Sequence, residues 1–488
     1  MTDGIQGVYG GSLALLTDLY QLTMAAGYWK AGVSEREAVF HLTFRKPPFG
    51  GGYAIAAGIA PAVEYLRRFQ FTDDDVAYLA TLTDGANKPM FEPAFLAYLR
   101  EMKFSCTVDA VPEGSLVFAH EPILRVRGPI LQAQLVETPL LTLINFQTLL
   151  ATKASRIAFA AKGAPVLEFG LRRAQGIDGG IGASRAAYIG GCAATSNVLA
   201  GKLFGIPVRG THAHSWIMFH GDELAAFRAY AQALPGNCTF LVDTYDTLEG
   251  VRNAITVGHE LVAGGHELAG IRLDSGDLAY LSAQARDMLD EAGFTNAKIV
   301  ASNDLDEIII GHIQDQGSRI DVWGVGTKLV TAFDQPALGG VYKLGAARDE
   351  HGVWREAIKL SEQPIKISNP GVLQIRRLLK GGKLVGDVIF DSEHGCEQPC
   401  ELHDIERPAR MPIAPAFDES FDLLSTVVDA GRPITLPDLE AARQRAAADL
   451  AMLSPRTRRF LNPQPYPVGL DAHVHRRKEE LVREARNA

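Results

Sequence analysis

The stretch Ala-Pro-Val-Leu-Glu-Phe-Gly-Leu-Arg-Arg at residues 164–173 decides the predicted fold, together with Ile-Pro-Val-Arg-Gly-Thr-His-Ala-His-Ser at residues 206–215. Each stretch begins as a short apolar run and stops at charged or hydroxyl side chains. Polar groups placed where apolar strands end are typical of an active site built on the carboxyl ends of barrel strands. The alternative is a core sheet with two ordinary loops, in which the histidines are only hydrogen-bonded.

The same pattern recurs further along the chain, where apolar runs end at Asp243, Asp274, Ser302 and Gly324. The strand ends follow one another at intervals of roughly 20–45 residues, which suits repeated strand–helix units. We therefore predict an α/β fold with an irregular TIM-like barrel over residues 136–345. The six visible units do not establish closure, and an open doubly wound sheet is the alternative.

The residues before the barrel predict an N-terminal α+β domain over residues 1–135. A helix is expected after the capping pair Thr17-Asp18, and residues 38–45 alternate as a strand does. Further helices are expected between residues 59 and 103.

A C-terminal region is expected over residues 346–488. The β-rich residues 340–395 are predicted to join the N-terminal sheet, and the tail from residue 434 is predicted to be helical. The charged run at residues 476–480 is interpreted as a solvated helix face.

Composition restricts the class of protein. Of the 488 residues, 47% are hydrophobic and 22% charged, as in an ordinary globular protein, and the formal net charge of −9 disfavours a nucleic-acid surface. The longest apolar stretch is too short for a membrane span. Five scattered cysteines without a secretory leader indicate reduced thiols and a cytoplasmic location. Cys396, Cys400 and His403 lack a fourth ligand, which favours an ordinary loop over a metal site.

Three features suit a phosphorylated or anionic ligand. The turn Gly324-Val-Gly326-Thr327 offers backbone N–H groups to a phosphate, although a helix-capping turn would look the same. Ser302 and Asn303, on the preceding strand end, add polar groups beside it. Arg45 and Lys46 precede a loop rich in glycine and proline, where they either bind an anion or end a solvated strand.

The loop Asp274-Ser-Gly-Asp277 brings two carboxylates together. They could hold Mg²⁺ or accept hydrogen bonds from ribose hydroxyls, whereas an Asx turn that caps the next helix would need only one of them. Arg272 lies on the same side of its strand as Asp274 and could bind an anion or stack on an aromatic ring. His214 is the best candidate for a nucleophile or general base, and one of the pair His212 and His214 could be structural.

Several long motifs in a fixed order carry a resemblance that covers nearly the whole chain. The motifs are Thr17-Asp-Leu-Tyr20-Gln-Leu-Thr-Met24, Phe44-Arg45, Glu168-Phe-Gly-Leu-Arg172-Arg-Ala-Gln-Gly176, Ala194-Thr-Ser-Asn197, Gly210-Thr-His-Ala-His-Ser215, Leu273-Asp-Ser-Gly-Asp277 and Gly324-Val-Gly-Thr327. In these motifs the chain resembles the nicotinate phosphoribosyltransferase family.

The resemblance implies an activity and its co-substrates. It implies synthesis of nicotinate mononucleotide and pyrophosphate from nicotinate and 5-phosphoribosyl 1-diphosphate, with Mg²⁺. ATP hydrolysis would be coupled through a phosphohistidine, which the Ala-His-Ser pattern places at His214. The resemblance also implies a cytoplasmic homodimer with shared active sites, without a nucleic-acid or membrane partner. Quinolinate and nicotinamide phosphoribosyltransferases are the nearest rivals, and a non-catalytic phosphate-binding barrel is a rival of another class.

The resemblance further implies the roles of individual residues. Phe169 and Arg272 match positions that sandwich a pyridine ring, and Tyr20 would reach the partner's site, although Tyr20 could instead be a core residue. Ala194 replaces an aspartate that related nicotinamide enzymes carry near this position. The implied nicotinate-binding residues are Tyr20, Phe169, Arg172, Ser215 and Arg272. The implied phosphate-binding residues are Arg45, Lys46, Ser302, Asn303, Gly324, Gly326 and Thr327. His214 and Asp274 are the implied catalytic residues, and Asp274 and Asp277 the implied Mg²⁺ ligands.

Overall fold

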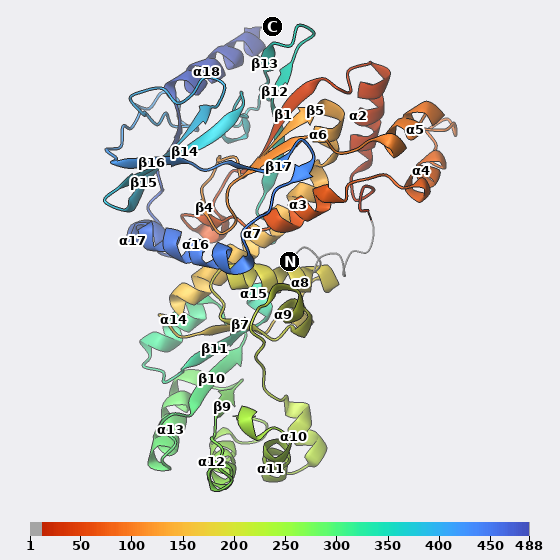
Figure 1. Ribbon diagram of the computed structural model, residues 1–488. Helices are drawn as coiled ribbons and strands as arrows, with labels where there is room; N and C mark the ends of the chain where they lie inside the picture. The colour runs from red at the N-terminus through yellow and green to blue at the C-terminus, as the bar shows by residue number, and fades with distance from the viewer. Residues whose placement is uncertain (1–11, 488) are drawn as a thin grey trace. The chain divides into compact units, whose positions relative to one another are not determined.

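Figure 1 shows the computed structural model, which describes residues 12–487. The described chain divides into two compact units. The first contains the residues up to Thr152 and those from Ala337 onward, and the second runs from Lys153 to Pro336. The second unit is thus shorter at both ends than residues 136–345, over which the sequence predicted the barrel. Its first limit lies inside helix α7 (Glu137–Ala160), which runs without a break through residue 152.

The second unit is built on a parallel sheet of six strands. Its strands are β6 (Val166–Glu168), β7 (Ala194–Thr195), β8 (Thr239–Leu241), β9 (Gly270–Leu273), β10 (Lys298–Asn303) and β11 (Val322–Val325). They are ordered β7-β6-β11-β10-β9-β8. Phe240, Ile271 and Trp323 are fully buried in these strands, as expected for a parallel sheet that is covered on both faces.

The strands follow the order expected around a barrel, but the sheet is not closed. Strand β11, the last along the chain, pairs with β6, the first. An isolated bridge between Thr195 and Val208 continues the order beyond β7, but in the described part of the chain no ladder joins Val208 to β8. The mixed α/β fold is therefore confirmed, whereas closure into a barrel is not shown.

The prediction of a full strand at residues 206–208 is wrong. This stretch forms only the bridge to Thr195, and the ladder strand of this region is β7 instead. Pro207 lacks an N–H and so cannot extend a ladder. The histidines that follow consequently lie beyond a bridge, with His214 in the first turn of helix α10 (His214–His220).

Helices alternate with these strands, and α12 and α13 pack on β9 (Figure 1). Aspartate side chains cap four of them: Asp222 before α11, Asp246 before α12, Asp277 before α13 and Asp306 before α14. Each accepts backbone N–H groups that have no partner within the helix. The helices are α8 (Gly176–Ile189), α9 (Val198–Phe204), α11 (Glu223–Ala233), α12 (Thr247–Ala263), α13 (Leu278–Glu291), α14 (Glu307–Asp315) and α15 (Thr327–Val330).

The first unit contains an antiparallel sheet of seven strands in the order β13-β12-β1-β5-β3-β17-β18. From the β-rich residues 340–395, only β12 and β13 join this sheet. Helix α6 (Ile130–Leu135) packs on β1 and β5. The strands are β1 (Glu37–Phe44), β3 (Thr107–Ala110), β5 (Leu124–Pro129), β12 (Gly340–Arg348), β13 (Trp354–Glu356), β17 (Ser425–Asp429) and β18 (Arg432–Pro433).

A second sheet of the first unit has the order β16-β14-β15-β19. Buried Arg377 of β14 donates to Asp387 of β15, with 2.7 Å between Nη2 and Oδ2. The strands are β14 (Leu373–Lys380), β15 (Lys383–Asp391), β16 (Glu419–Asp422) and β19 (Val468–Leu470).

The tail helix α18 (Ala472–Asn487) packs on β15 and β19 of this sheet. The interpretation of residues 476–480 as a solvated face is wrong in part. Lys478 is only 6% exposed, and Arg477 bonds to Glu356 as well as to Glu480.

Most of the remaining helices of the first unit come from the N-terminal part of the sequence. Helix α2 begins with a capping box between Asp18 and Gln21. The helices are α2 (Leu19–Lys30), α3 (Ile59–Arg67), α4 (Asp73–Ala80), α5 (Pro93–Glu101), α16 (Leu439–Met452) and α17 (Pro455–Arg458). Within residues 12–487 no helix is both long and apolar enough to cross a lipid bilayer.

Candidate functional site

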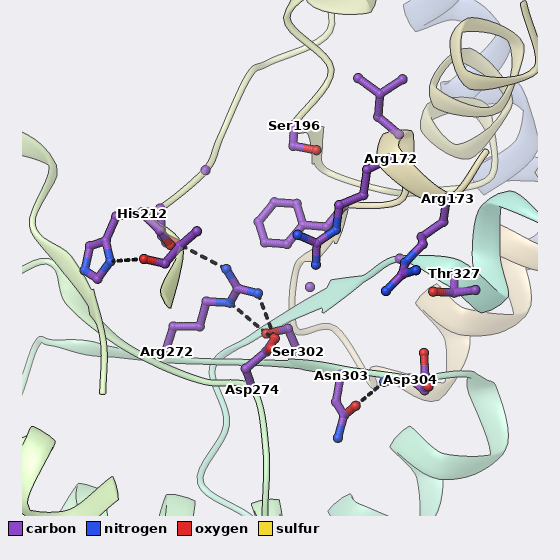
Figure 2. A pocket seen from close by; sticks show the side chains of 17 residues that line it. Arg172, Arg173, Ser196, His212, Arg272, Asp274, Ser302, Asn303, Asp304 and Thr327 are labelled. Carbon is purple, nitrogen blue, oxygen red and sulfur yellow. Dashed lines mark hydrogen bonds and ion pairs between the residues drawn. The ribbon is translucent and has the colours of Figure 1, made fainter. Parts of the chain in front are cut away.

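A cavity of about 660 Å³ opens where the parallel strands of the second unit end (Figure 2). Most of its lining comes from the carboxyl-terminal ends of β6, β9, β10 and β11 and from the turns that follow them, which the change from apolar to polar residues predicted. The lining residues are Phe169, Leu171, Arg172, Arg173, Ser196, Gly210, Thr211, His212, Ala213, Arg272, Asp274, Ser302, Asn303, Asp304, Gly324, Gly326 and Thr327.

The guanidinium of Arg272 is fixed by three hydrogen bonds. It donates to Ser302 Oγ and to Asp274 Oδ1, both at 2.7 Å, and to Thr211 Oγ1 at 3.1 Å. These contacts direct the guanidinium into the cavity, as Figure 2 shows. Since the three partners lie on different segments, Arg272 joins those segments at the floor of the cavity.

Arg272 also lies over the ring of Phe169, with its Cζ 5.7 Å from the ring centroid. This separation is a cation–π contact. A flat ring inserted between the two groups would need about 7 Å, because each face requires a contact of roughly 3.5 Å. The two residues that the resemblance pairs are thus brought together, but a sandwiched ring would require them to move apart.

Gly324 is required beside Phe169 for reasons of space. A Cβ atom at this glycine would lie 2.7 Å from Cδ2 of the Phe169 ring. The glycine of the predicted phosphate turn therefore has a packing function that the sequence did not reveal. Gly326 and Thr327 follow it at the cavity wall.

Asp274 is held as an anion. Its carboxylate accepts from Ser302 Oγ as well as from Arg272. Burial acts to raise the pKa of Asp274, but hydrogen bonding from Ser302 and the charge of Arg272 outweigh it and lower this pKa below its usual value. One carboxylate therefore stays charged at the cavity wall at neutral pH.

His212 is the more buried member of the histidine pair. It is 8% exposed, and its Nε2 accepts the backbone N–H of Leu241 at 3.2 Å. Burial lowers the pKa of His212 to about 4. The ring is thus neutral at physiological pH and connects its segment to β8.

His214 has different surroundings. Its side chain is 38% exposed, Nδ1 lies 3.1 Å from Thr244 Oγ1, and Nε2 lies 3.7 Å from Asp274 Oδ2 and 3.9 Å from Asp243 Oδ1. The ring is thus accessible and sits between hydrogen-bonding groups from two strand ends. It is not among the residues that line the cavity, but it adjoins one of them, Asp274.

Asp243 is a residue of this cluster to which the sequence assigned no role. Its side chain is fully buried, and Oδ2 accepts from the Asp274 backbone N–H at 2.8 Å and from Ser275 Oγ at 2.6 Å. Its other oxygen has no hydrogen-bond partner among the described residues and faces His214. The position of Asp243 at the end of an apolar run was the available signal.

Several predicted site residues lie outside the cavity. Ser215 is exposed on α10. Asp277 caps α13 by accepting from the Tyr280 N–H at 3.1 Å, which is the Asx alternative. Ala194 is buried in β7, and the residue of that motif at the cavity wall is Ser196.

Tyr20, Arg45 and Lys46 belong to the first unit. Tyr20 is 48% exposed, so the alternative that it is a core residue is wrong. Burial, followed by the charges of Glu137 and Asp18, raises the pKa of Tyr20, which keeps its hydroxyl protonated. Lys46 is exposed at the end of β1.

Arg45 lies in a hollow of the first unit that we call the basic pocket. Arg45, Lys343 and Lys366 supply three cations to it, and none of the three forms an ion pair within residues 12–487. Cations without an ion-pair partner attract anions. The full lining is His41, Thr43, Arg45, His120, Val341, Lys343, Ile365, Lys366, Ile367, Ser368, Asn369 and Leu373.

The described residues contain no group of three or more His, Cys, Asp or Glu side chains that could hold a metal ion. The sulfur atoms of Cys396 and Cys400 lie 3.6 Å apart, while the ring of His403 stacks on His475.

Comparison with known proteins identifies the family. The family model of the nicotinate phosphoribosyltransferase N-terminal domain matches residues 15–145, and that of the C-terminal domain matches residues 374–478. Nicotinate phosphoribosyltransferase from Bacillus subtilis (strain 168) is 44% identical over 99% of this chain and 97% of its own length. The chain belongs to the nicotinate phosphoribosyltransferase family.

A human sequence and a human crystal structure support this family membership. Human nicotinate phosphoribosyltransferase is 37% identical over 94% of this chain and 95% of its own length. A crystal structure of human nicotinic acid phosphoribosyltransferase matches with a TM-score of 0.82 at 33% identity, covering 95% of this chain and 99% of that chain. A nicotinate phosphoribosyltransferase fold thus extends over both units.

Protonation of His212 should destabilise the protein at acidic pH. Because the pKa of His212 is about 4 in the folded chain and about 6.5 when unfolded, the unfolded state binds the extra proton between these values. The free energy of unfolding should fall as the pH is lowered from 6.5 to 4, by on the order of 3 kcal/mol from this residue.

Urea unfolding across this pH range checks the expectation. The difference in unfolding free energy between the intact protein and His212→Asn should change with pH, because the variant lacks the titrating ring. Parallel pH curves for the two proteins would contradict the assignment of His212 as a buried neutral ring.

Proposed function

We propose that this chain forms nicotinate mononucleotide and pyrophosphate from nicotinate and 5-phosphoribosyl 1-diphosphate, with ATP hydrolysis as the coupled reaction. The observation that carries the proposal is the cavity in which Phe169 and cationic side chains adjoin small polar groups at neighbouring strand ends. An aromatic ring with a carboxylate matches the first part, and a sugar phosphate matches the second. Membership of the family supports the same activity.

Arg172 is proposed to bind the nicotinate carboxylate. Arg272 is already paired with Asp274, whereas Arg172 forms no ion pair among the described residues and lines the same cavity. Arg272 and Phe169 then provide the surfaces against which the pyridine ring stacks. Ser196 contributes no negative charge of its own to the cavity wall, which suits an acid better than an aspartate at this position would.

Ser302, Asn303, Gly324, Gly326 and Thr327 are proposed to hold the 5-phosphate of the ribose. Hydroxyl, amide and backbone groups in compact turns suit a phosphate because they approach it closely. In the transfer, the pyridine nitrogen bonds to C1 of the ribose while the bond from C1 to pyrophosphate breaks, and the electron pair leaves with pyrophosphate. The charged Asp274 would stabilise positive charge that develops at C1.

Mg²⁺ fits this site only as an ion that is held mainly by the substrate. Asp274 is engaged by Arg272 and Ser302, and Asp277 by the cap of α13. One or two carboxylates plus substrate phosphates are a common Mg²⁺ environment. When bound, the ion would neutralise charge on the pyrophosphate.

His214 is proposed to accept the phosphoryl group of ATP. Asp243 and Asp274 both lie near Nε2, so they favour a proton on that nitrogen and leave the lone pair on Nδ1. A bond from Nδ1 to the γ-phosphorus would form as the bond to the ADP oxygen breaks. The buried Asp243 would then orient the ring and balance its charge.

The basic pocket of the first unit is proposed to bind phosphate groups of these substrates. Arg45 thereby keeps its predicted role, together with Lys343 and Lys366, whereas Lys46 would act only from the rim. The chain is proposed to work as a homodimer in which Tyr20 serves the partner's site. We also propose that the second unit is an incompletely closed barrel, because its last strand, β11, pairs with its first, β6.

Replacement of His214 by Ala should abolish nicotinate-dependent ATP hydrolysis and leave a slow transfer without ATP. The binding groups for both transfer substrates remain in the variant, so positioning still accelerates the reaction. Acid-labile phosphate on the protein, measured after incubation with labelled ATP, should be lost. Label that persists in His214→Ala but is absent from His212→Ala would move the role to His212.

The intact protein should strongly prefer nicotinate to nicotinamide and quinolinate. Removal of the Arg172 guanidinium should cost about 1.5–3 kcal/mol, hence a tenfold to hundredfold loss of kcat/KM for nicotinate. The assay offers each pyridine with 5-phosphoribosyl 1-diphosphate and Mg²⁺, with and without ATP. Arg209→Ala is a matched control, because Arg209 lies outside the cavity lining. Equal use of nicotinate and nicotinamide would contradict the assignment.

Mixed dimers should test whether the sites are shared. Tyr20→Ala and His214→Ala are each expected to remove most of the ATP-coupled activity of their own homodimer. A mixed dimer would contain one site with both defects and one with neither, so mixing should restore part of the activity. If subunits exchange and no activity returns, Tyr20 serves its own chain's site.

A further inference from the structure

The tail helix α18 carries a buried lysine that the proposed function does not use. Lys478 is 6% exposed, and its Nζ donates to Asn369 Oδ1 at 2.8 Å. It forms no ion pair with a carboxylate in the described chain. Lysine is seldom buried without such a partner, because removal of an ammonium group from water costs free energy. The neutral side chain of Asn369 is thus its observed partner.

Asn369 belongs to the segment of residues 359–369, which we call the pocket segment. Lys366, Ser368 and Asn369 of this segment line the basic pocket. Its regular structure consists of one short turn, Pro364–Lys366. A segment with so little regular structure depends on individual contacts to hold its side chains in place.

The other hydrogen bonds of the pocket segment stay within it. Ile367 N–H donates to Pro364 O at 3.0 Å, and Lys359 N–H donates to Ser368 Oγ at 2.8 Å. The bond from Lys478, by contrast, connects the segment to α18, which packs on β15 and β19. Lys478 therefore anchors a poorly supported segment to a regular part of the first unit.

The surroundings of Lys478 support an anchoring function. Its side chain lines a second hollow together with apolar Pro364, Ile367, Ile405 and Leu470, and the rest of that lining includes the carboxylates of Asp404 and Glu479. The lysine stem is thus packed among the apolar groups while its ammonium reaches Asn369. Lys478 does not itself line the basic pocket, so any effect on a ligand there must pass through the pocket segment.

We propose that Lys478 is a positioning residue, which acts through Asn369 to hold the pocket segment so that Lys366 and Ser368 face a bound phosphate group. This inference rests on the proposed function of the basic pocket. A ligand that binds to a preformed pocket does not have to order it, so loss of the anchor should weaken binding without removing a direct contact.

Calorimetric binding of inorganic pyrophosphate with Mg²⁺ to the full-length chain tests the inference. Lys366→Met removes a cation of the pocket and should weaken binding about tenfold or more. Lys478→Met removes the anchor and should weaken it about threefold to tenfold. Asn369→Leu should weaken binding at least as much as Lys478→Met, because Asn369 also lines the basic pocket. The double variant should bind no more weakly than Asn369→Leu, because both changes remove the same hydrogen bond.

Kinetics and a control distinguish positioning from general destabilisation. In Lys478→Met the KM for 5-phosphoribosyl 1-diphosphate should rise, while kcat and the KM for nicotinate stay as in the intact protein. Arg476→Met is the matched control. It removes an ion pair of the same helix, from Arg476 Nη2 to Glu397 Oε1 at 2.6 Å, and should leave pyrophosphate binding unchanged.

Comparison of the variants distinguishes failure of the proposed anchor from failure of the proposed phosphate binding in the basic pocket. If Lys366→Met weakens binding while Lys478→Met and Asn369→Leu lower only the melting temperature, Lys478 is merely structural. Additive losses in the double variant would also overturn the anchor. If Lys366→Met leaves pyrophosphate binding unchanged, the basic pocket does not bind phosphate, and both proposals fail. If Lys478→Met does not fold, Lys478→Gln takes its place, because Asn369→Leu also changes the lining of the basic pocket.

Discussion

The cavity of the second unit depends on the hydrogen bonds that the guanidinium of Arg272 donates. It connects Asp274, Ser302 and Thr211, which come from three different segments, and it supports the ring of Phe169. Without this cation, the charged Asp274 would lose a hydrogen-bond donor in a half-buried position, which is costly. The same contact occupies Arg272, and Arg172 and Arg173 are consequently the lining cations without an ion pair in the described chain.

Local sequence patterns predicted the parts of the site that depend on neighbouring residues. The change from apolar to polar residues marks the ends of β6, β9, β10 and β11, because a buried parallel strand is apolar until it leaves the sheet. β7 is only two residues long and shows no periodicity, so it was missed. Closure of the sheet depends on pairing between distant segments, which a strand-by-strand pattern does not contain.

Burial that depends on distant residues could not be predicted. Lys478 belongs to a charged run of a type that is normally solvated, and its partner Asn369 lies far away in the sequence. Asp243 ends an apolar run like several other residues, and only the structure shows that its free oxygen faces His214. Ala194 and Ser196 lie two positions apart, and the length of β7 decides which of them reaches the cavity.

The open seam of the parallel sheet has a consequence for motion. In the described chain, the backbone of residues 210–212 makes no hydrogen bond to a strand, and the His212 ring alone reaches across to β8. The segment that carries His214 can therefore shift without breaking a ladder. Such freedom would serve the role proposed for His214, because this one segment could change position while the surrounding strands stay rigid.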